Sequence, residues 1–240
     1  MNKLHILHLY PNEMNTYGDR GNLLTLKRRA EWHRLEPIIH YYHVGDTLPK
    51  QVDVVLGGGG QDSAQGAIQD DILRIGDALH RLVEANVPML MVCGTYQLFG
   101  RRFITHDGQE IKGIGVFDVE TTGGDKRLIG NVAVEAADFG TIYGFENHSG
   151  RTTLGDGQAP FARVLRGNGN NGEDKTEGAR VCNAIGTYIH GPVLPNNPGL
   201  ADGLLRLGLS RSGVATSLGS LELDDSLTSL ARQNAQGRRY

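Results

Sequence analysis

The first 92 residues alternate between short apolar runs and longer segments with helical spacing. Apolar or alternating positions predict strands at residues 4–10, 37–44, 52–56 and 87–92, and a three-to-four-residue repeat predicts helices at 22–35 and 68–85. The run at 87–92 (VPMLMV) contains no polar residue, which is typical of a strand buried on both faces. The alternation predicts an α/β fold with a mostly parallel sheet covered by helices, and a ligand crevice at the carboxyl ends of the strands.

The pattern changes after Lys112, where the chain becomes richer in sheet and irregular loops. Strands are predicted at residues 113–121, 130–135, 141–146 and 184–190, and helices at 197–209 and 221–231. The polar segment 166–178 (RGNGNNGEDKTEG) predicts a mobile surface loop between strands. We therefore predict one domain over residues 1–210, followed by a C-terminal helix and a frayed tail over 211–240 that is a candidate for partner contact.

Composition narrows the class of protein. The 240 residues suit one large α/β domain, and a net charge of −3 gives no reason to expect nucleic acid or an anionic membrane as the main partner. Only two cysteines occur, which excludes a disulfide framework and predicts a reducing compartment, the cytoplasm. No apolar run is long enough for a membrane-spanning helix, and the N-terminal apolar stretch, ending at Pro11, predicts a strand and not a signal peptide.

Cys93 lies where the buried strand at 87–92 ends and a sequence that can begin a helix follows. A strand-to-helix turn of this kind lifts a nucleophile above the sheet and directs the next amide N–H groups at the same point. The alternative interpretation is a buried structural cysteine, which is common. On this segment alone the two interpretations are equally good.

The position of His190 favours the interpretation of Cys93 as a nucleophile. It ends another apolar strand, so its imidazole can project at the same edge of the sheet as Cys93 and serve as its base. The remaining histidines lack such a context, and neither an HExxH motif nor a CxxC pair occurs. The sequence therefore predicts a Cys–His pair and no metal site.

Four consecutive glycines, residues 57–60, follow the strand predicted at 52–56. A phosphate-binding loop is disfavoured because the lysine of a nucleotide loop is missing. The preferred interpretation is a backbone that approaches the reaction closely, with the N–H groups of Gly59 and Gly94 forming an oxyanion hole. A flexible turn without a chemical role remains the alternative.

Cys93, Gln97, the glycine run and His190 together resemble a class I glutamine amidotransferase domain of the cobyric-acid-synthase-like branch. The resemblance covers residues 1 to about 210 and rests on six ordered motifs: YPNEMNTYGDRGN (10–22), GGGGQD (57–62), VCGTYQLFG (92–100), GDKRLIGN (124–131), YGFENHSGR (143–151) and TYIHGPVLPNNP (187–198). It implies a flavodoxin-like, three-layer glutaminase fold that hydrolyses L-glutamine through a cysteinyl thioester, with Cys93 as nucleophile and His190 as base.

The resemblance also implies a substrate pocket. Arg127 is expected to hold the α-carboxylate, a task that suits a guanidinium able to make two parallel hydrogen bonds. The other residues expected to bind glutamine are Gln97, Gly58, Asn147, His148 and Ser149. Without the resemblance, Arg127 reads as an ordinary solvated charge, and residues 146–148 read as a turn cap.

Two positions depart from the family pattern. Many relatives carry an acid two residues after the histidine, where this chain has Pro192. We therefore expect either a Cys–His dyad or a third member from elsewhere in the chain. The second departure is Thr95, where many relatives have glycine, and it removes no reacting group.

The implied biological role is that of a glutaminase subunit in a heterodimer. A Mur-ligase-like synthetase partner would use ATP to activate the D-glutamate carboxylate of lipid II for amidation to D-isoglutamine in peptidoglycan synthesis. This chain has no nucleotide loop and no length for a synthetase domain, so no cofactor is expected in it. The alternatives are a glutaminase for a cobyric-acid-type acceptor, a different Cys–His hydrolase on the same fold, and a non-catalytic glutamine-binding subunit.

Overall fold

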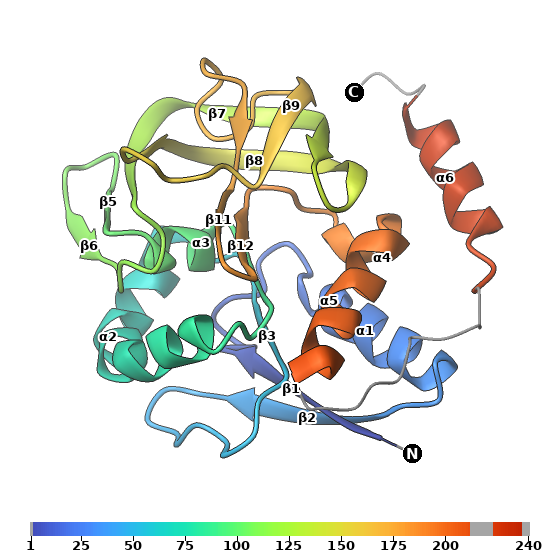
Figure 1. The fold of residues 1–240 in the computed structure, drawn as a ribbon. Helices are drawn as coiled ribbons and strands as arrows, with labels where there is room; N and C mark the ends of the chain where they lie inside the picture. The colour runs from blue at the N-terminus through green and yellow to red at the C-terminus, as the bar shows by residue number, and fades with distance from the viewer. Residues whose placement is uncertain (1, 212–222, 237–240) are drawn as a thin grey trace.

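A six-stranded sheet forms the centre of the computed structural model, which describes residues 2–211 and 223–236 (Figure 1). Its strand order is β11-β12-β4-β3-β1-β2, and every neighbouring pair is parallel except the edge hairpin β11–β12. The bounds are β1 (Lys3–Leu9), β2 (Glu36–Tyr42), β3 (Val54–Gly57), β4 (Met89–Val92), β11 (Ala179–Val181) and β12 (Ala184–Thr187). All residues of β3, β4 and β12 are buried, because helices cover both faces of the sheet.

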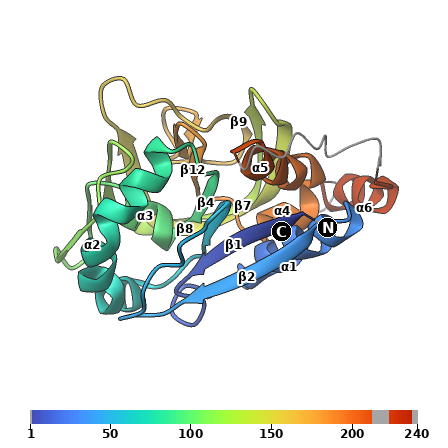
Figure 2. The ribbon, with the colours of Figure 1, turned by 60° about the horizontal axis from the view of Figure 1, so that its bottom comes forward.

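Helices lie on both sides of this sheet, as Figures 1 and 2 show. One side carries α2 (Asp62–Glu84) and α3 (Gly94–Phe99), and the other carries α1 (Arg20–Trp32), α4 (Val193–Asn196) and α5 (Pro198–Arg211). The helix α6 (Ser226–Gln236) contacts α4 and is tied to α1 by an ion pair of 2.7 Å between Arg29 and Asp225. The three layers confirm the predicted flavodoxin-like α/β architecture.

A second sheet contains the β-rich part of the chain. Its order is β10-β9-β7-β5-β6, with β8 paired to β7. The bounds are β5 (Arg102–Ile104), β6 (Glu110–Lys112), β7 (Val119–Ala136), β8 (Gly140–Leu154), β9 (Ala162–Arg166) and β10 (Thr176–Glu177). An isolated antiparallel bridge between Phe145 and His190 joins β8 to the segment that follows β12. The second sheet is therefore joined to the first part of the fold at His190, the predicted base.

The first half of the chain follows the predicted elements, with small shifts of their ends. The largest shift is in α2, which begins at Asp62, although its apolar period starts only at Ile68. In the second half, the strands predicted at 130–135 and 141–146 lie within β7 and β8, whereas residues 113–118 of the strand predicted at 113–121 are not in a strand. Two long strands, β7 and β8, form one hairpin, and the glycine-rich stretch between Gly123 and Leu128 is a shift of register within it and not a turn.

Near the C-terminus, α6 overlaps the helix predicted at 221–231. Residues 212–222 and the end of the predicted frayed tail, 237–240, lie outside the described residues. Within the described part, no helix has both the length and the apolar character needed to cross a membrane.

The predicted mobile loop at 166–178 is instead anchored to the molecule by buried residues, although residues 172–175 are exposed. Asn170 and Glu177 are completely buried. The Asn170 side chain accepts from the Gly178 N–H and donates to the Gly178 carbonyl, each at 2.9 Å. Glu146 accepts bonds from the amides of Asn168 and Gly169. Polar side chains replace the hydrophobic contacts that this segment lacks, and composition alone does not show them.

Replacing Asn170 with alanine is expected to destabilise the protein by about 3 kcal/mol, because Gly178 then loses both partners while remaining buried. Chemical denaturation measures the free energy of unfolding. Glu173→Ala, at an exposed position of the same segment, is the control and should change it by less than about 0.5 kcal/mol. Equal effects of the two substitutions would contradict the anchoring role of Asn170.

Candidate active site

Cys93 connects β4 to α3 in a backbone conformation that side chains rarely adopt, with φ 50° and ψ −104°. Its N–H donates to the carbonyl of Thr187 on β12 at 2.8 Å, and its carbonyl accepts from Gln97 N in α3 at 2.9 Å. These bonds hold the strained residue between sheet and helix. The predicted strand-to-helix elbow is confirmed, and only 6% of Cys93 is exposed.

His190 is buried three residues beyond the end of β12. It exchanges two backbone hydrogen bonds with Phe145 of β8, and its ring lies against Tyr17, with 4.2 Å between ring centroids. Its Nδ1 lies 3.9 Å from Oδ1 of Asp19, the residue that precedes α1. Neither of these two atoms has a hydrogen-bond partner among the described residues.

Gly59 shows how closely the three side chains converge. A Cβ added there would lie 3.1 Å from His190 Cε1, 3.2 Å from Cys93 Cβ and 3.2 Å from Asp19 Oδ2. Only glycine leaves this space open. The Gly59 N–H donates to Asp19 Oδ2 at 2.7 Å. This bond corrects the expectation that Gly59 supplies an oxyanion donor, because its single N–H already holds the carboxylate.

The charges of this cluster favour an ion pair. Burial by itself lowers the pKa of His190, but the interactions of its ring with Cys93 and with the Asp19 carboxylate outweigh this effect and raise that pKa to about 10. At neutral pH the imidazole is therefore protonated beside the sulfur. This is the arrangement that activates a cysteine nucleophile.

Asp19 is the residue that the sequence analysis missed. Its signal was present, since it is an acid immediately before a helix, within the first motif of the family resemblance. Pro192, which takes the place of the usual acid, packs against this same segment: a Cβ on Gly21 would lie 2.3 Å from Pro192 Cγ. The Asp19 carboxylate thus reaches His190 from the segment before α1, whereas many relatives carry their acid two residues after the histidine.

A polar cavity of about 520 Å³ opens beside Cys93. It brings together five of the predicted substrate-binding residues, and its lining adds Tyr17, Gly60, Gln61, Asp62, Ser63 and Gln65, which were not among them. The predicted residues in the lining are Gln97, Arg127, Asn147, His148 and Ser149. The expectation that Gly58 binds glutamine is corrected, because Gly58 does not line this cavity. It is buried against Met14, whose carbonyl oxygen would lie 2.1 Å from a Cβ added to Gly58.

Arg127 lies exposed at the cavity, held by neighbours from two elements. Its guanidinium donates to the side-chain and main-chain oxygens of Asn147, at 2.7 and 2.8 Å, and to the hydroxyl of Tyr17 at 2.9 Å. Asn147 therefore orients the arginine. A guanidinium fixed in this way can bind a carboxylate without losing much side-chain freedom.

A chain of hydrogen bonds holds the wall of the cavity beside Cys93 in place. Gln65 Nε2 donates to Gln97 Oε1 at 2.8 Å, and Gln97 Nε2 donates to the hydroxyl of Tyr188 at 3.1 Å. That hydroxyl also pairs with Thr152 at 2.7 Å. Because both ends of the Gln97 amide have partners in the protein, Gln97 positions Gln65 in the cavity wall.

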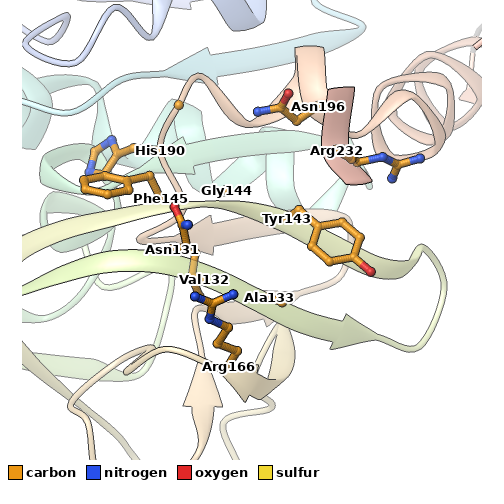
Figure 3. A pocket seen from close by; sticks show the side chains of 11 residues that line it. Asn131, Val132, Ala133, Tyr143, Gly144, Phe145, Arg166, His190, Asn196 and Arg232 are labelled. Carbon is orange, nitrogen blue, oxygen red and sulfur yellow. The ribbon is translucent and has the colours of Figure 1, made fainter. Parts of the chain in front are cut away.

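A second cavity, of about 600 Å³, reaches His190 from another side (Figure 3). Its walls are Asn131, Val132 and Ala133 of β7, Tyr143, Gly144 and Phe145 of β8, and Arg166, Gly191, Asn196 and Arg232. Arg232, from α6, lies 5.7 Å from the ring centroid of Tyr143. Of the residues that the structure describes, no aspartate or glutamate lines this cavity. Among residues 2–211 and 223–236, no group of three or more His, Cys, Asp or Glu side chains is placed to bind a metal.

The fold and the site place a cysteine on a strand-to-helix elbow beside a histidine and a carboxylate, an arrangement typical of α/β enzymes that use a nucleophilic side chain. Comparison with known proteins identifies the family. Residues 5–198 match the CobB/CobQ-like glutamine amidotransferase domain, so the chain belongs to this family and is a glutamine amidotransferase.

Curated relatives agree with this assignment. The chain is 37% identical to the lipid II isoglutaminyl synthase (glutamine-hydrolyzing) subunit GatD of Staphylococcus aureus, over 89% of this chain and 88% of that protein. It is 39% identical to the subunit of the same name in Streptococcus pneumoniae, over 87% and 82%. A probable cobyric acid synthase of Methanothermobacter thermautotrophicus is 28% identical, over 73% of this chain and 39% of that protein.

Solved structures support the fold. One described as a glutamine amidotransferase has a TM-score of 0.59 at 15% identity, covering 84% of this chain and 98% of that chain. PurLQS from Thermotoga maritima has a TM-score of 0.58 at 13% identity, covering 88% and 99%.

Asp19→Asn is expected to lower the pKa of His190 by about one unit or more. The amide oxygen can still accept from Gly59, but the negative charge beside Nδ1 is lost, so the imidazolium loses its proton at lower pH. The pH dependence of the imidazole NMR signals measures this pKa. The signals of the exposed His106 serve as the internal control. A His190 pKa that stays unchanged would contradict the coupling.

Proposed function

We propose that this chain is the glutaminase subunit of a two-subunit synthetase. It hydrolyses L-glutamine to glutamate and ammonia through a cysteinyl thioester and supplies the ammonia to a partner. The observation that carries the proposal is the convergence of Cys93, His190 and Asp19 around Gly59, beside a polar cavity with Arg127 in its wall. The exposed charges of Arg127 and Asp62 suit the carboxylate and ammonium groups of an amino acid.

In the first half of the reaction, the Cys93 thiolate attacks the carboxamide carbon and the C=O electrons move to the oxygen. The N–H of Gly94 and that of Gly60, whose nitrogen would lie 2.9 Å from a Cβ on Gly94, stabilise this oxyanion. Protonated His190 donates its proton to the departing nitrogen, and the C–N bond breaks as the C=O bond re-forms. Ammonia is released, and a γ-glutamyl thioester remains on Cys93.

In the second half, neutral His190 takes a proton from water as the water attacks the thioester. Collapse of the tetrahedral intermediate breaks the C–S bond, releases glutamate and restores the thiolate–imidazolium pair. Asp19 keeps Nδ1 of His190 in place through both halves and stabilises its protonated form.

The acceptor we propose is the D-glutamate carboxylate of lipid II, amidated to D-isoglutamine in peptidoglycan synthesis. Support comes from the two subunits named for this reaction, of which the chain covers 88% and 82%, whereas it covers only 39% of the probable cobyric acid synthase. The partner would then be a Mur-ligase-like subunit of the MurT kind, which binds ATP and forms a heterodimer with this chain in the cytoplasm.

Ammonia must reach the partner without being protonated, since ammonium is no nucleophile. His190, which we propose protonates the departing nitrogen, lines the cavity of Figure 3. The lining also includes Arg232, and the positive charges of Arg232 and of protonated His190 disfavour ammonium relative to ammonia. We therefore assign the second cavity as the exit route.

Cys93→Ala is expected to reduce glutamine hydrolysis by more than about 1,000-fold, because no other nucleophile occupies the elbow. Ammonia release from glutamine measures the effect. The control is Cys182→Ala, which removes the exposed cysteine and should leave the rate unchanged. Full activity of Cys93→Ala would refute the mechanism, as would ATP-dependent amidation of lipid II by this chain without a partner.

Ala133→Phe tests the exit route, because the larger side chain would fill part of the second cavity. With the partner present, glutamine hydrolysis should persist while glutamine-dependent amidation falls several-fold. Added ammonium chloride should restore amidation, since it bypasses the cavity. Glutamine-dependent amidation at the level of the unchanged protein would place the route elsewhere.

A further inference from the structure

Two buried side chains in the glutamine cavity present hydrogen-bond acceptors that nothing in the described protein satisfies. These acceptors are Nε2 of His148 and Oε1 of Gln65. Both residues line the cavity that contains Cys93, with only 2% and 1% of their surface exposed. A buried polar atom without a partner costs free energy, so a pair of them at a binding cavity points to groups on the ligand.

The contacts of His148 determine which of its nitrogens carries the proton. Its Nδ1 lies 2.9 Å from the carbonyl oxygen of Gly150, which can only accept, so Nδ1 must donate. The ring is stacked on Tyr188, with 3.8 Å between centroids and 7° between planes. Burial lowers the pKa of His148 to about 3, so the ring is neutral at physiological pH. Nε2 is therefore a fixed acceptor.

The orientation of the Gln65 side-chain amide is also determined by its hydrogen bonds. Its Nε2 faces two acceptors, Gln97 Oε1 at 2.8 Å and the Gly60 carbonyl at 3.5 Å. The carbonyl cannot donate, so the nitrogen must occupy this side of the amide and Oε1 must occupy the other. Gln97 donates in turn to Tyr188, the residue on which His148 is stacked. One tyrosine thus positions both acceptors.

The position of the charges decides which end of glutamine these acceptors meet. Arg127 and Asp62 are exposed, so the charged end of the substrate lies at the opening of the cavity. The carboxamide must reach Cys93, which is buried, as are both acceptors. Protonated His190 and the oxyanion donors offer only N–H groups. The two hydrogens of the carboxamide nitrogen therefore need acceptors from other residues.

We propose that His148 and Gln65 recognise the carboxamide NH₂ of glutamine and thereby distinguish it from glutamate and from γ-esters. The inference rests on the proposed glutaminase function and extends it to the choice of substrate. A γ-carboxylate in the same place would face two lone pairs, which opposes binding of the product. An ester has no hydrogen to donate, so it leaves both acceptors unpaired.

The test measures ligand binding by calorimetry in the full-length Cys93→Ala protein, which prevents turnover. The ligands are L-glutamine and L-glutamate γ-methyl ester, which carries OCH₃ in place of NH₂. His148→Asn keeps a donor for Gly150 but has no atom at the position of Nε2, and His148→Gln places an oxygen there. Gln65→Met is an independent variant that removes the second acceptor. Thermal unfolding checks that each variant is folded.

His148→Asn and Gln65→Met should each weaken glutamine binding about tenfold, the loss of one hydrogen bond, while ester binding stays within about twofold. His148→Gln should restore the preference for glutamine. Equal weakening of both ligands, or unchanged glutamine binding, would overturn the inference and leave the proposed function standing. If the parent protein binds neither ligand, the glutamine pocket itself is refuted, and the inference with it.

Discussion

The packing of Cys93, Asp19 and protonated His190 around one glycine is the constraint on which the site depends. Burial alone would favour the neutral imidazole, because a low-dielectric site penalises its charge. The interactions of the His190 ring with Cys93 and with the Asp19 carboxylate outweigh that penalty and keep the imidazole protonated. The surrounding fold serves to hold these groups within a few ångströms without filling the space between them, which is why Gly59 lies at their centre.

The three groups come from three different connections at the carboxyl edge of the parallel sheet. Cys93 follows β4, His190 follows β12, and Asp19 lies between β1 and α1. Because β1, β4 and β12 run parallel, their carboxyl ends lie at one edge of the sheet, where the ligand crevice of α/β folds lies. The second sheet completes the crevice, since its strand β8 contributes Asn147, His148 and Ser149 to the cavity and pairs with His190 through Phe145.

Polar networks, and not only apolar packing, give the site its shape. Glu146 and Asn170 anchor the glycine-rich segment, while Gln65, Gln97 and Tyr188 form a continuous chain beneath the substrate cavity. Such networks are costly when a member lacks its partner and rigid when all are satisfied. Several of the buried polar atoms that lack a partner in the described protein lie at the site, on His148, Gln65, His190 and Asp19, where a substrate and the reaction can use them.

The amino-acid sequence by itself determined the alternation of strands and helices in the first half, the elbow at Cys93 and the importance of His190. These features are local, because burial on both faces of a strand leaves an uninterrupted apolar run that ends where the site begins. The family motifs led to Arg127 and to the stretch from Asn147 to Ser149, although the assignment of Gly58 and Gly59 to substrate and oxyanion was wrong.

Only the tertiary structure decided that Asp19 faces His190, that buried Asn170 anchors the segment 166–178, and that β7 and β8 continue through a glycine-rich shift of register. The physical reason is the same in each case. Hydrogen bonds between residues far apart in the chain depend on how the sheets are ordered, and they leave no periodic pattern in the residues that make them.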